Sequence, residues 1–412
     1  MSESVTNWAG NIVFGALRLH HPGSVEEVRD LVAAGGPLRV LGSGHSFNRM
    51  ADTTGDLISL AGLPRVVEVS ADRKSVRVDG GIRYGELAVR LQEEGLALHN
   101  TASLPHISVA GAVATATHGS GVRNANLATA VSGLEFIDGS GNMVVLTRDN
   151  ADLSGAVVGL GALGVVTALT LDVVPAFSLR QYVYDAVPRA SLVGHLSEML
   201  ADGYSVSLFT DWTGLDANMA WLKRTEPMSG PWFGAQPADG PRHPVPGMPA
   251  QNSTDQSGEL GPWHTRLPHF RMEFTPSAGA ELQSEYHVAA ADGLAAIDAV
   301  ASIRSQVASV LQVCEIRAIA ADSLWLSPNY ERDSIALHFT WIADTAAVEP
   351  VVAEVERVLA PLNPRPHWGK VFTMAPADVR AAFPRFQDFA ELVRRYDPAG
   401  TFRNEWLDAI LG

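Results

Sequence analysis

Residues 38–48 read LRVLGSGHSFN, a short apolar strand followed by a Gly-Ser-Gly turn and a histidine. Glycines at positions 42 and 44 permit backbone conformations that other residues rarely adopt, so consecutive N–H groups can converge on an anion such as a phosphate. His45 then lies within reach of the molecule that carries the phosphate. The residues alone leave two interpretations open, a phosphate cradle beside a functional histidine and a glycine turn with an incidental one.

A second stretch of small residues, SLPHISVAGAVATATHGSG, covers residues 103–121. Thr115, Thr117, Ser120 and the backbone amides there are available to polar groups. Two such loops within one α+β domain indicate a large, extended ligand that bears phosphate. Tight packing of loops against each other is the alternative interpretation.

A third glycine-rich segment, GLGALG at residues 159–164, matches the G-x-G-x-x-G dinucleotide fingerprint. That fingerprint requires a following helix whose N-terminus faces the pyrophosphate. The residues that follow, VVTALTLDVVP, are β-branched and predict a strand instead. The pattern therefore disfavours a nicotinamide-binding Rossmann domain. The chain also lacks the G-K-[ST] of a P-loop and the G-x-S-x-G of a serine hydrolase.

Composition indicates a large globular enzyme. The chain has 412 residues, of which 46% are hydrophobic and 18% are charged, enough for two or three domains. A net charge of −15 disfavours nucleic acid and anionic membranes as partners. Cys314 is the single cysteine, which excludes an intrachain disulfide and a cysteine-based metal site.

Two further sequence features concern metals and location. The 13 histidines form no motif with metal-ligand spacing, so we predict no metal. No apolar run approaches the ~18 residues of a membrane span, and the first residues lack the pattern of a secretory leader. We expect a cytoplasmic monomer.

Hydrophobic periodicity changes near residue 176. Before it, helix and strand signals alternate, with a capping pair at Ser24 and Glu27, a helix over 84–95 and a hairpin over 134–147. After it, longer strands are predicted at 204–211, 218–223, 282–289, 311–320 and 334–343, with helices over 292–309 and 345–360. The Pro/Gly-rich stretch 226–268 contains Trp232 and Trp263, which favour a packed surface loop or lid.

Polar residues interrupt the apolar strands of the second part. Glu315 and Arg317 are two residues apart and so share one face of a strand, as do His338 and Thr340. Lys370 lies among apolar and aromatic residues. Buried charges are unfavourable unless paired, so Glu315 with Arg317 could be a structural pair and His338 a core histidine. Together the strands offer donors and acceptors with no excess of charge, which suits a neutral, multiply hydroxylated ligand.

These segments together resemble the vanillyl-alcohol-oxidase family of PCMH-type FAD-binding flavoproteins, and within it the alditol (xylitol) oxidases. The similarity runs nearly from end to end. The most specific stretches are VLGSGHSFN, ASLPHISVAG, GPWHTRLPHFRMEFTPS at 261–277, CEIRAIAAD, HFTW and RPHWGKVF, with GALGVVTALTL and the terminal YDPAGTFRNEWL in support.

The resemblance implies an α+β fold in three parts. Residues 1–175 would form an FAD-binding domain of two subdomains, and residues 176–371 a substrate domain with a large, mostly antiparallel sheet. Residues 372–412 would then rejoin the FAD-binding domain.

The resemblance also implies roles for individual residues. His45 would be bonded covalently to the 8α-methyl group of FAD, and Ala102 would leave dioxygen a path to the flavin. The other expected FAD contacts are Val40, Leu41, Gly42, Ser43, Gly44, Ser46, Ser103, Ser108, Gly111, Thr115, Ala116, Thr117, His118 and Val166. Ser103, Glu315, Arg317 and Thr340 would bind the polyol hydroxyls. His338 and Lys370 would lie near the reacting C1 hydroxyl and flavin N5, and either could be the base.

The implied reaction is FAD-dependent oxidation of the terminal hydroxyl of alditols such as xylitol and sorbitol. A base accepts the hydroxyl proton, hydride passes from C1 to flavin N5, and dioxygen is reduced to hydrogen peroxide. An aldonolactone oxidase or dehydrogenase of the same superfamily is the close alternative. A polyol-binding protein without flavin is the alternative from another class.

Overall fold

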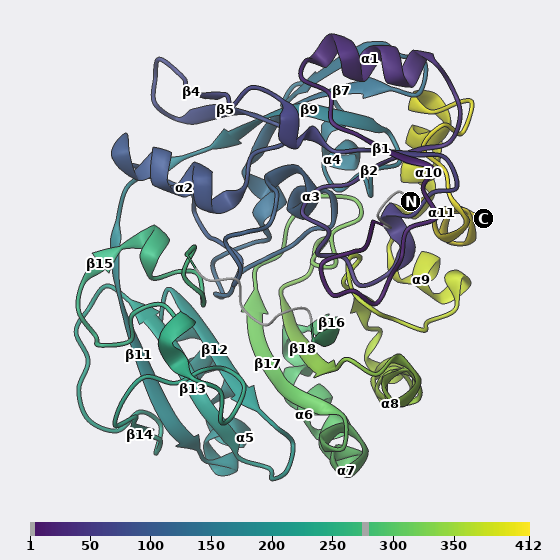
Figure 1. Ribbon diagram of the computed structural model, residues 1–412. Coiled ribbons are helices and arrows are strands. Elements are labelled where there is room, and N and C mark those ends of the chain that lie inside the picture. The colour runs from purple at the N-terminus through teal and green to yellow at the C-terminus, as the bar shows by residue number, and fades with distance from the viewer. Residues whose placement is uncertain (1–4, 274–279) are drawn as a thin grey trace.

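The computed structural model describes residues 5–273 and 280–412, so the last four letters of the GPWHTRLPHFRMEFTPS stretch lie outside the described residues. The architecture is α+β, with the first part of the chain at the top of Figure 1 and a nine-stranded sheet below it. The C-terminal helices return to the side of the first part. The predicted fold class is confirmed.

The first part begins with a small parallel sheet in the order β1-β3-β2. Its strands are β1 (Arg18–His20), β2 (Leu38–Val40) and β3 (Asp56–Ile58). Helix α1 (Val25–Ala33) connects β1 to β2, and its first turn is capped as predicted, because Ser24 Oγ accepts from Glu27 N. The LGSGHSF turn therefore starts where β2 ends.

A five-stranded antiparallel sheet follows, in the order β4-β5-β9-β7-β8. Its strands are β4 (Val67–Val69), β5 (Ser75–Asp79), β7 (Val131–Asp138), β8 (Met143–Thr147) and β9 (Gly164–Asp172). The helices of this part are α2 (Tyr84–Glu93), α3 (Val109–Ala114) and α4 (Leu153–Ala156), and a short pair joins β6 (Leu96–Ala97) to β10 (Val174–Pro175). The GLGALG segment leads into strand β9, which confirms that it opens no dinucleotide-binding helix.

The third sheet has nine strands in the order β14-β11-β13-β12-β17-β18-β16-β19, with β15 paired to β11. They are β11 (Ser178–Val187), β12 (Ser205–Thr210), β13 (Ala217–Arg224), β14 (Gln236–Pro237), β15 (Gly261–Pro262), β16 (Glu281–Ala289), β17 (Leu311–Ile319), β18 (Ser334–Ile342) and β19 (Arg365–Pro366).

Helices cover one face of this sheet, below it in Figure 1. They are α5 (Arg189–Ala201), α6 (Gly293–Ser302), α7 (Arg304–Ala308) and α8 (Thr345–Leu359). Cys314 and Ile316 of β17 share a core cluster with Ile297 and Val352 of these helices. Because side chains alternate along a strand, Glu315 and Arg317 face the other way, as predicted.

The C-terminal helices pack against the first part of the chain, as the yellow ribbons in Figure 1 show. They are α9 (Pro376–Ala382), α10 (Phe386–Tyr396) and α11 (Glu405–Leu411). Phe389 and Leu407 belong to the same core cluster as Leu134 and Leu169 of strands β7 and β9. Leu38 N donates to Thr401 O over 2.8 Å, and Arg39 Nη1 donates to Phe402 O over 2.8 Å. The two ends of the chain thus build one core.

The Pro/Gly-rich stretch 226–268 is packed, as its tryptophans predicted. Trp232 and Trp263 are buried, and the short strands β14 and β15 attach the stretch to β11. His243, Val245 and Met248 from this stretch line the cavity described below.

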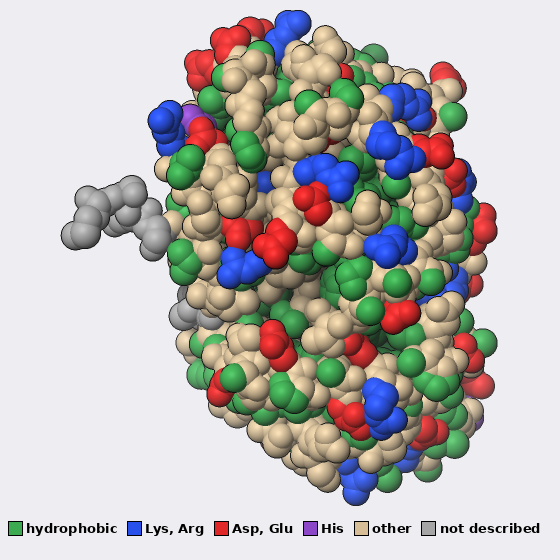
Figure 2. Space-filling view, turned by 90° about the vertical axis from the view of Figure 1, so that its right-hand side faces the viewer, with side chains coloured by type: hydrophobic (Ala, Val, Ile, Leu, Met, Phe, Trp, Pro, Cys, Tyr) green, Lys and Arg blue, Asp and Glu red, His purple; other side chains and the backbone are tan. Residues whose placement is uncertain are grey.

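Two surface observations complete the fold. Among the described residues, no helix combines the length and apolar character needed to cross a membrane. On the face drawn in Figure 2, acidic and basic side chains alternate across the surface. A surface that binds a highly charged polymer usually has a large patch of one charge, and this face has no such patch in the view of Figure 2.

Candidate active site

A cavity of about 330 Å³ lies where the glycine-rich turns meet the large sheet. The predicted site residues that line it are Val40, Leu41, Gly42, Ser43, Gly44, His45, Ser46, Ala102, Ser103, Ser108, Gly111, Thr115, Thr117, His118, Val166, Glu315, Arg317, His338, Thr340 and Lys370. Ala116 does not line it. Its side chain is buried in the core and its φ is 52°, a turn between the two cavity-lining threonines.

The two glycine-rich segments touch each other at one wall of the cavity. A Cβ on Gly42 would come within 2.4 Å of Ser108 Oγ, and Gly44 has a φ of +71°, so each position requires glycine. Ser108 N donates to Ser43 Oγ over 3.2 Å. Ser108 Oγ is buried and has no hydrogen-bond partner among the described residues. This wall therefore offers close backbone approach and an unused hydroxyl, which fits an extended phosphate-bearing cofactor such as FAD.

His45 is held as a neutral imidazole beside that wall. Its Nδ1 lies 3.1 Å from Ser43 O, and its ring stacks on Trp8 with ring centroids 4.8 Å apart. Burial lowers the pKa of His45 to about 4. A neutral ring nitrogen has a lone pair, so His45 has the chemical form that covalent attachment requires.

Three strands of the large sheet carry a row of polar residues on the cavity side. In the register, His338 of β18 lies directly opposite Glu315 of β17 and opposite Glu285 of β16. Directly opposite residues point to the same face. The row therefore brings together two carboxylates and an imidazole, and Glu285 is a member that the sequence patterns did not identify.

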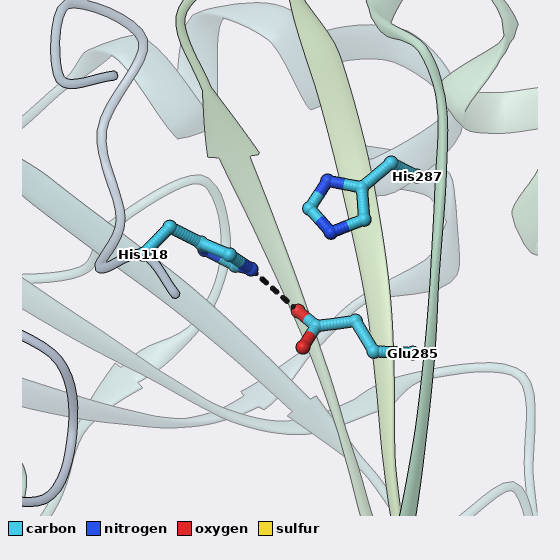
Figure 3. A group of neighbouring side chains, drawn as sticks. All are labelled: His118, Glu285 and His287. Carbon is cyan, nitrogen blue, oxygen red and sulfur yellow. Dashed lines mark ion pairs between the residues drawn. The ribbon is translucent and has the colours of Figure 1, made fainter. Parts of the chain in front are cut away.

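Glu285 is a fully buried carboxylate surrounded by basic groups. Its oxygens lie 2.5 Å from Lys370 Nζ and 2.8 Å from Arg317 Nη2. Figure 3 shows the third neighbour, His118, whose Nε2 lies 2.9 Å from Glu285 Oε1. Burial alone would raise the pKa of Glu285, but Lys370, His118 and Arg317 hold it well below its ordinary value.

Arg317 is ion-paired with two carboxylates, and its hydrogen bond goes to Glu285. Arg317 Nη1 lies 3.6 Å from Glu315 Oε2, beyond hydrogen-bond distance. Glu315 and Arg317 thus form a long ion pair, and Arg317 also has a shorter contact with Glu285, so a structural pairing of Glu315 with Arg317 stays open. Arg317 lines the cavity, and its Nη2 is held by Glu285.

The base candidates differ in their surroundings. Burial, reinforced by Lys370, lowers the pKa of His338 to about 4, and its Nε2 lies 3.2 Å from Gln283 Oε1. Burial also lowers the pKa of Lys370, but the ion pair with Glu285 opposes that shift and favours its charged form. His338 is thus the neutral group of the two.

Within residues 5–273 and 280–412, one group of side chains has ligand atoms close enough to hold a metal ion. His118, Glu285 and His287 place such atoms within 4.8 Å of one another (Figure 3). The carboxylate of that group already accepts from Lys370 and Arg317, whose charges would repel a metal cation. The absence of a metal therefore remains a prediction, and electrostatics favour it.

The sequence patterns did not predict several of the residues that line the cavity. Glu285, Gln283 and His269 all line the cavity, and so do Gly161 and Gly164 of the rejected fingerprint. Glu285 stands in ELQSEYHVA, where a carboxylate inside a strand of mostly buried residues is a detectable signal. His269 follows a proline in an irregular stretch, so no periodicity marks it.

Comparison with known proteins agrees with this geometry. A family described as "FAD binding domain" matches residues 16–147, and one described as "D-arabinono-1,4-lactone oxidase" matches residues 280–410. The chain is 52% identical to an alditol oxidase from Streptomyces sp. strain IKD472, over 100% of both chains. It is 29% identical to an L-gulono-1,4-lactone dehydrogenase from Mycobacterium tuberculosis, again over 100% of both. The solved cholesterol oxidase from B. sterolicum shares the fold, with a TM-score of 0.79, 15% identity and coverage of 100% of this chain and 97% of that one.

The fold and the glycine-rich cavity define an FAD-binding flavoprotein oxidoreductase of the vanillyl-alcohol-oxidase, PCMH-type class. Within that class, full-length identity places the chain in the alditol oxidase family, to which it belongs.

The contacts of Glu285 lead to a stability prediction. In Glu285→Gln, the ammonium of Lys370 and the guanidinium of Arg317 lose their buried counter-charge. We expect the free energy of unfolding to fall by about 3–5 kcal/mol, measured by urea unfolding of the purified protein. Glu356→Gln is the matched control, because that buried carboxylate accepts from the neutral groups Tyr286 and Thr373 and should lose less. Equal losses in the two variants would contradict the assigned ion pairing.

Proposed function

We propose that this protein oxidises the terminal C1 hydroxyl of alditols, such as xylitol and sorbitol, to the aldose, and that dioxygen leaves as hydrogen peroxide. The observation that carries the proposal is the cavity of about 330 Å³, in which a phosphate-cradling turn faces a wall of buried carboxylates paired with basic groups. The 52% identity to an alditol oxidase supports the substrate class.

The cofactor would be held by the first part of the chain. The backbone of residues 40–46 would bind the pyrophosphate, Ser108 Oγ would gain a partner, and His45 would form the covalent link. When bound, FAD would supply the hydride acceptor and the redox chemistry that connects substrate oxidation to dioxygen. Ala102 is small, which would leave dioxygen room to approach. Ala116 would contribute only through its backbone.

The sheet would bind and deprotonate the substrate. Ser103, Glu315, Arg317 and Thr340 offer both donors and acceptors to the polyol hydroxyls, and the charges of Glu315 and Arg317 balance. We assign proton acceptance from the C1 hydroxyl to His338, because its imidazole is neutral while Lys370 is ion-paired. Lys370 would then stabilise negative charge near the reacting atoms.

We also infer the division into 1–175, 176–371 and 372–412. It is supported by the shared core cluster of α9–α11 with β5, β7 and β9. A cytoplasmic location, a monomeric state, and polyol and dioxygen as the only partners remain predictions.

Substrate tests distinguish this function from its alternatives. We expect the purified protein to be yellow, and to consume oxygen and form peroxide with xylitol but not with L-gulono- or L-galactono-1,4-lactone. A peroxide-coupled assay and an oxygen electrode measure this. Activity with the lactones alone would favour an aldonolactone enzyme. Reduction of a dye without oxygen uptake would indicate a dehydrogenase, and a colourless protein would indicate binding without catalysis.

The covalent link has its own test. After acid precipitation, we expect flavin absorbance to stay with the protein pellet, because a bond to His45 survives denaturation. In His45→Ala the flavin should move to the supernatant or be missing. His195→Ala is the control, since that exposed histidine lies on α5 and contacts Glu198. Release of all flavin from the wild-type protein would refute the link while leaving FAD binding intact.

The pH dependence tests the assignment of His338. Its pKa is lowered to about 4, so the neutral, proton-accepting form persists well below the usual 6.5 and is lost only as the pH falls toward 4. We expect kcat/KM for xylitol to stay nearly constant from pH 7 down to about 5. We expect His338→Ala to lower kcat by about 10²–10⁴. An acid limb centred near pH 6.5, measured where the flavin spectrum shows the protein intact, would argue against His338 as the base.

A further inference from the structure

Behind Glu315, the wall of the cavity contains two buried titratable residues that the proposed reaction does not use. Lys223 of β13 and His269 are each at most 5% exposed. Lys223 Nζ contacts Leu267 O, lies 3.3 Å from Pro268 O and lies 3.0 Å from His269 Nδ1. Burial lowers the pKa of Lys223 to about 7, against the opposing effect of Glu315, and in its ammonium form Lys223 has three protons for these three acceptors.

The contact with Glu315 fixes which nitrogen of His269 carries the proton. An ionised carboxylate can only accept, so the proton of the neutral ring lies on Nε2, which donates to Glu315 Oε1 over 2.8 Å, and Nδ1 is left to accept from Lys223. Burial and the charge of Lys223 lower the pKa of His269 to about 4, so the ring is neutral at pH 7. The rings of Trp221 and Phe209 lie 5.0 Å and 5.8 Å from the imidazole and limit its rotation.

This arrangement leaves one oxygen of Glu315 for a ligand. Oε1 is occupied by His269. The nearest basic atoms to Oε2 are Arg317 Nη1 at 3.6 Å and His338 Nδ1 at 3.7 Å, both beyond a good hydrogen bond. A hydroxyl donor in the cavity could therefore bind Oε2 without displacing a protein group.

The backbone of the same segment reaches the opposite side of the pocket. His269 N and Phe270 N both donate to Ser103 O, over 3.0 Å and 3.2 Å. Residues 269–270 thus join Ser103 in the first part of the chain to Glu315 in the sheet. Two of the predicted substrate contacts are held by one short segment.

We infer that Lys223 and His269 are positioning residues that orient the Glu315 carboxylate toward a substrate hydroxyl. The inference rests on the proposed oxidation of alditols. Neither residue needs to touch the substrate or exchange a proton in the reaction. Their contribution is to keep Oε1 occupied and Oε2 directed into the cavity, which strengthens polyol binding.

A double-mutant cycle on the FAD-loaded protein tests this. We expect His269→Leu to lower kcat/KM for xylitol by about tenfold or more, chiefly through KM, because a charged acceptor loses its donor. In a Glu315→Gln background the same change should cost less than about twofold, because the residue acts through Glu315. Lys223→Met should behave like His269→Leu, and His269→Gln, which keeps an N–H donor, should recover most of the loss.

Controls separate positioning from general damage. His264→Leu alters a histidine of the same loop that does not contact Glu315, and should leave KM unchanged. Bound flavin per chain and Tm report folding. If His269→Leu does not retain FAD, Lys223→Met takes its place in the cycle.

Additive effects in the cycle, or a loss in kcat with KM unchanged, would overturn the inference. If the wild-type protein itself forms no peroxide from xylitol, the proposed function fails instead. The two failures are therefore distinguishable.

Discussion

The carboxylate of Glu285 lies in the interior with Lys370 on one oxygen and Arg317 on the other, and His118 from the glycine-rich segment beside them. An isolated ion in such a place would be strongly unfavourable, so each member depends on the others for its charge and its orientation. Because these groups come from β16, β17, the loop after β19 and the first part of the chain, their mutual neutralisation also fixes how the parts meet. The shape of the cavity follows from this contact.

The same balance explains what kind of molecule the cavity suits. Glu285 and Glu315 match Lys370 and Arg317 in charge, the neighbouring imidazoles of His338 and His269 are neutral, and burial lowers the pKa of Lys223, behind Glu315, to about 7. A chain of hydroxyls finds both hydrogen-bond donors and acceptors along this wall. The pairing of charges in this wall therefore suits a substrate that is uncharged and rich in hydroxyls.

Sequence patterns predicted the glycine turn, the strands with Glu315 and His338, and the strand after GLGALG, because each depends on local periodicity or backbone freedom. They could not predict that Arg317 pairs with Glu285, since the two lie 32 residues apart on strands that are not neighbours. His269 and Lys223 were missed for the same reason, because only the tertiary fold brings them behind Glu315. The family resemblance supplied the roles of His45 and Lys370, which spacing alone left open.

The contacts of Leu38 and Arg39 with Thr401 and Phe402 span more than 360 residues of chain. The glycine turn is synthesised early, but β2, the strand before it, lacks these C-terminal partners until almost all of the polypeptide has been made. The side-chain amide of Asn48 likewise donates to the carbonyls of Trp368 and Lys370, which are synthesised more than 300 residues later. On a partly synthesised chain, the wall of the cavity that the glycine turn forms therefore lacks its C-terminal contacts.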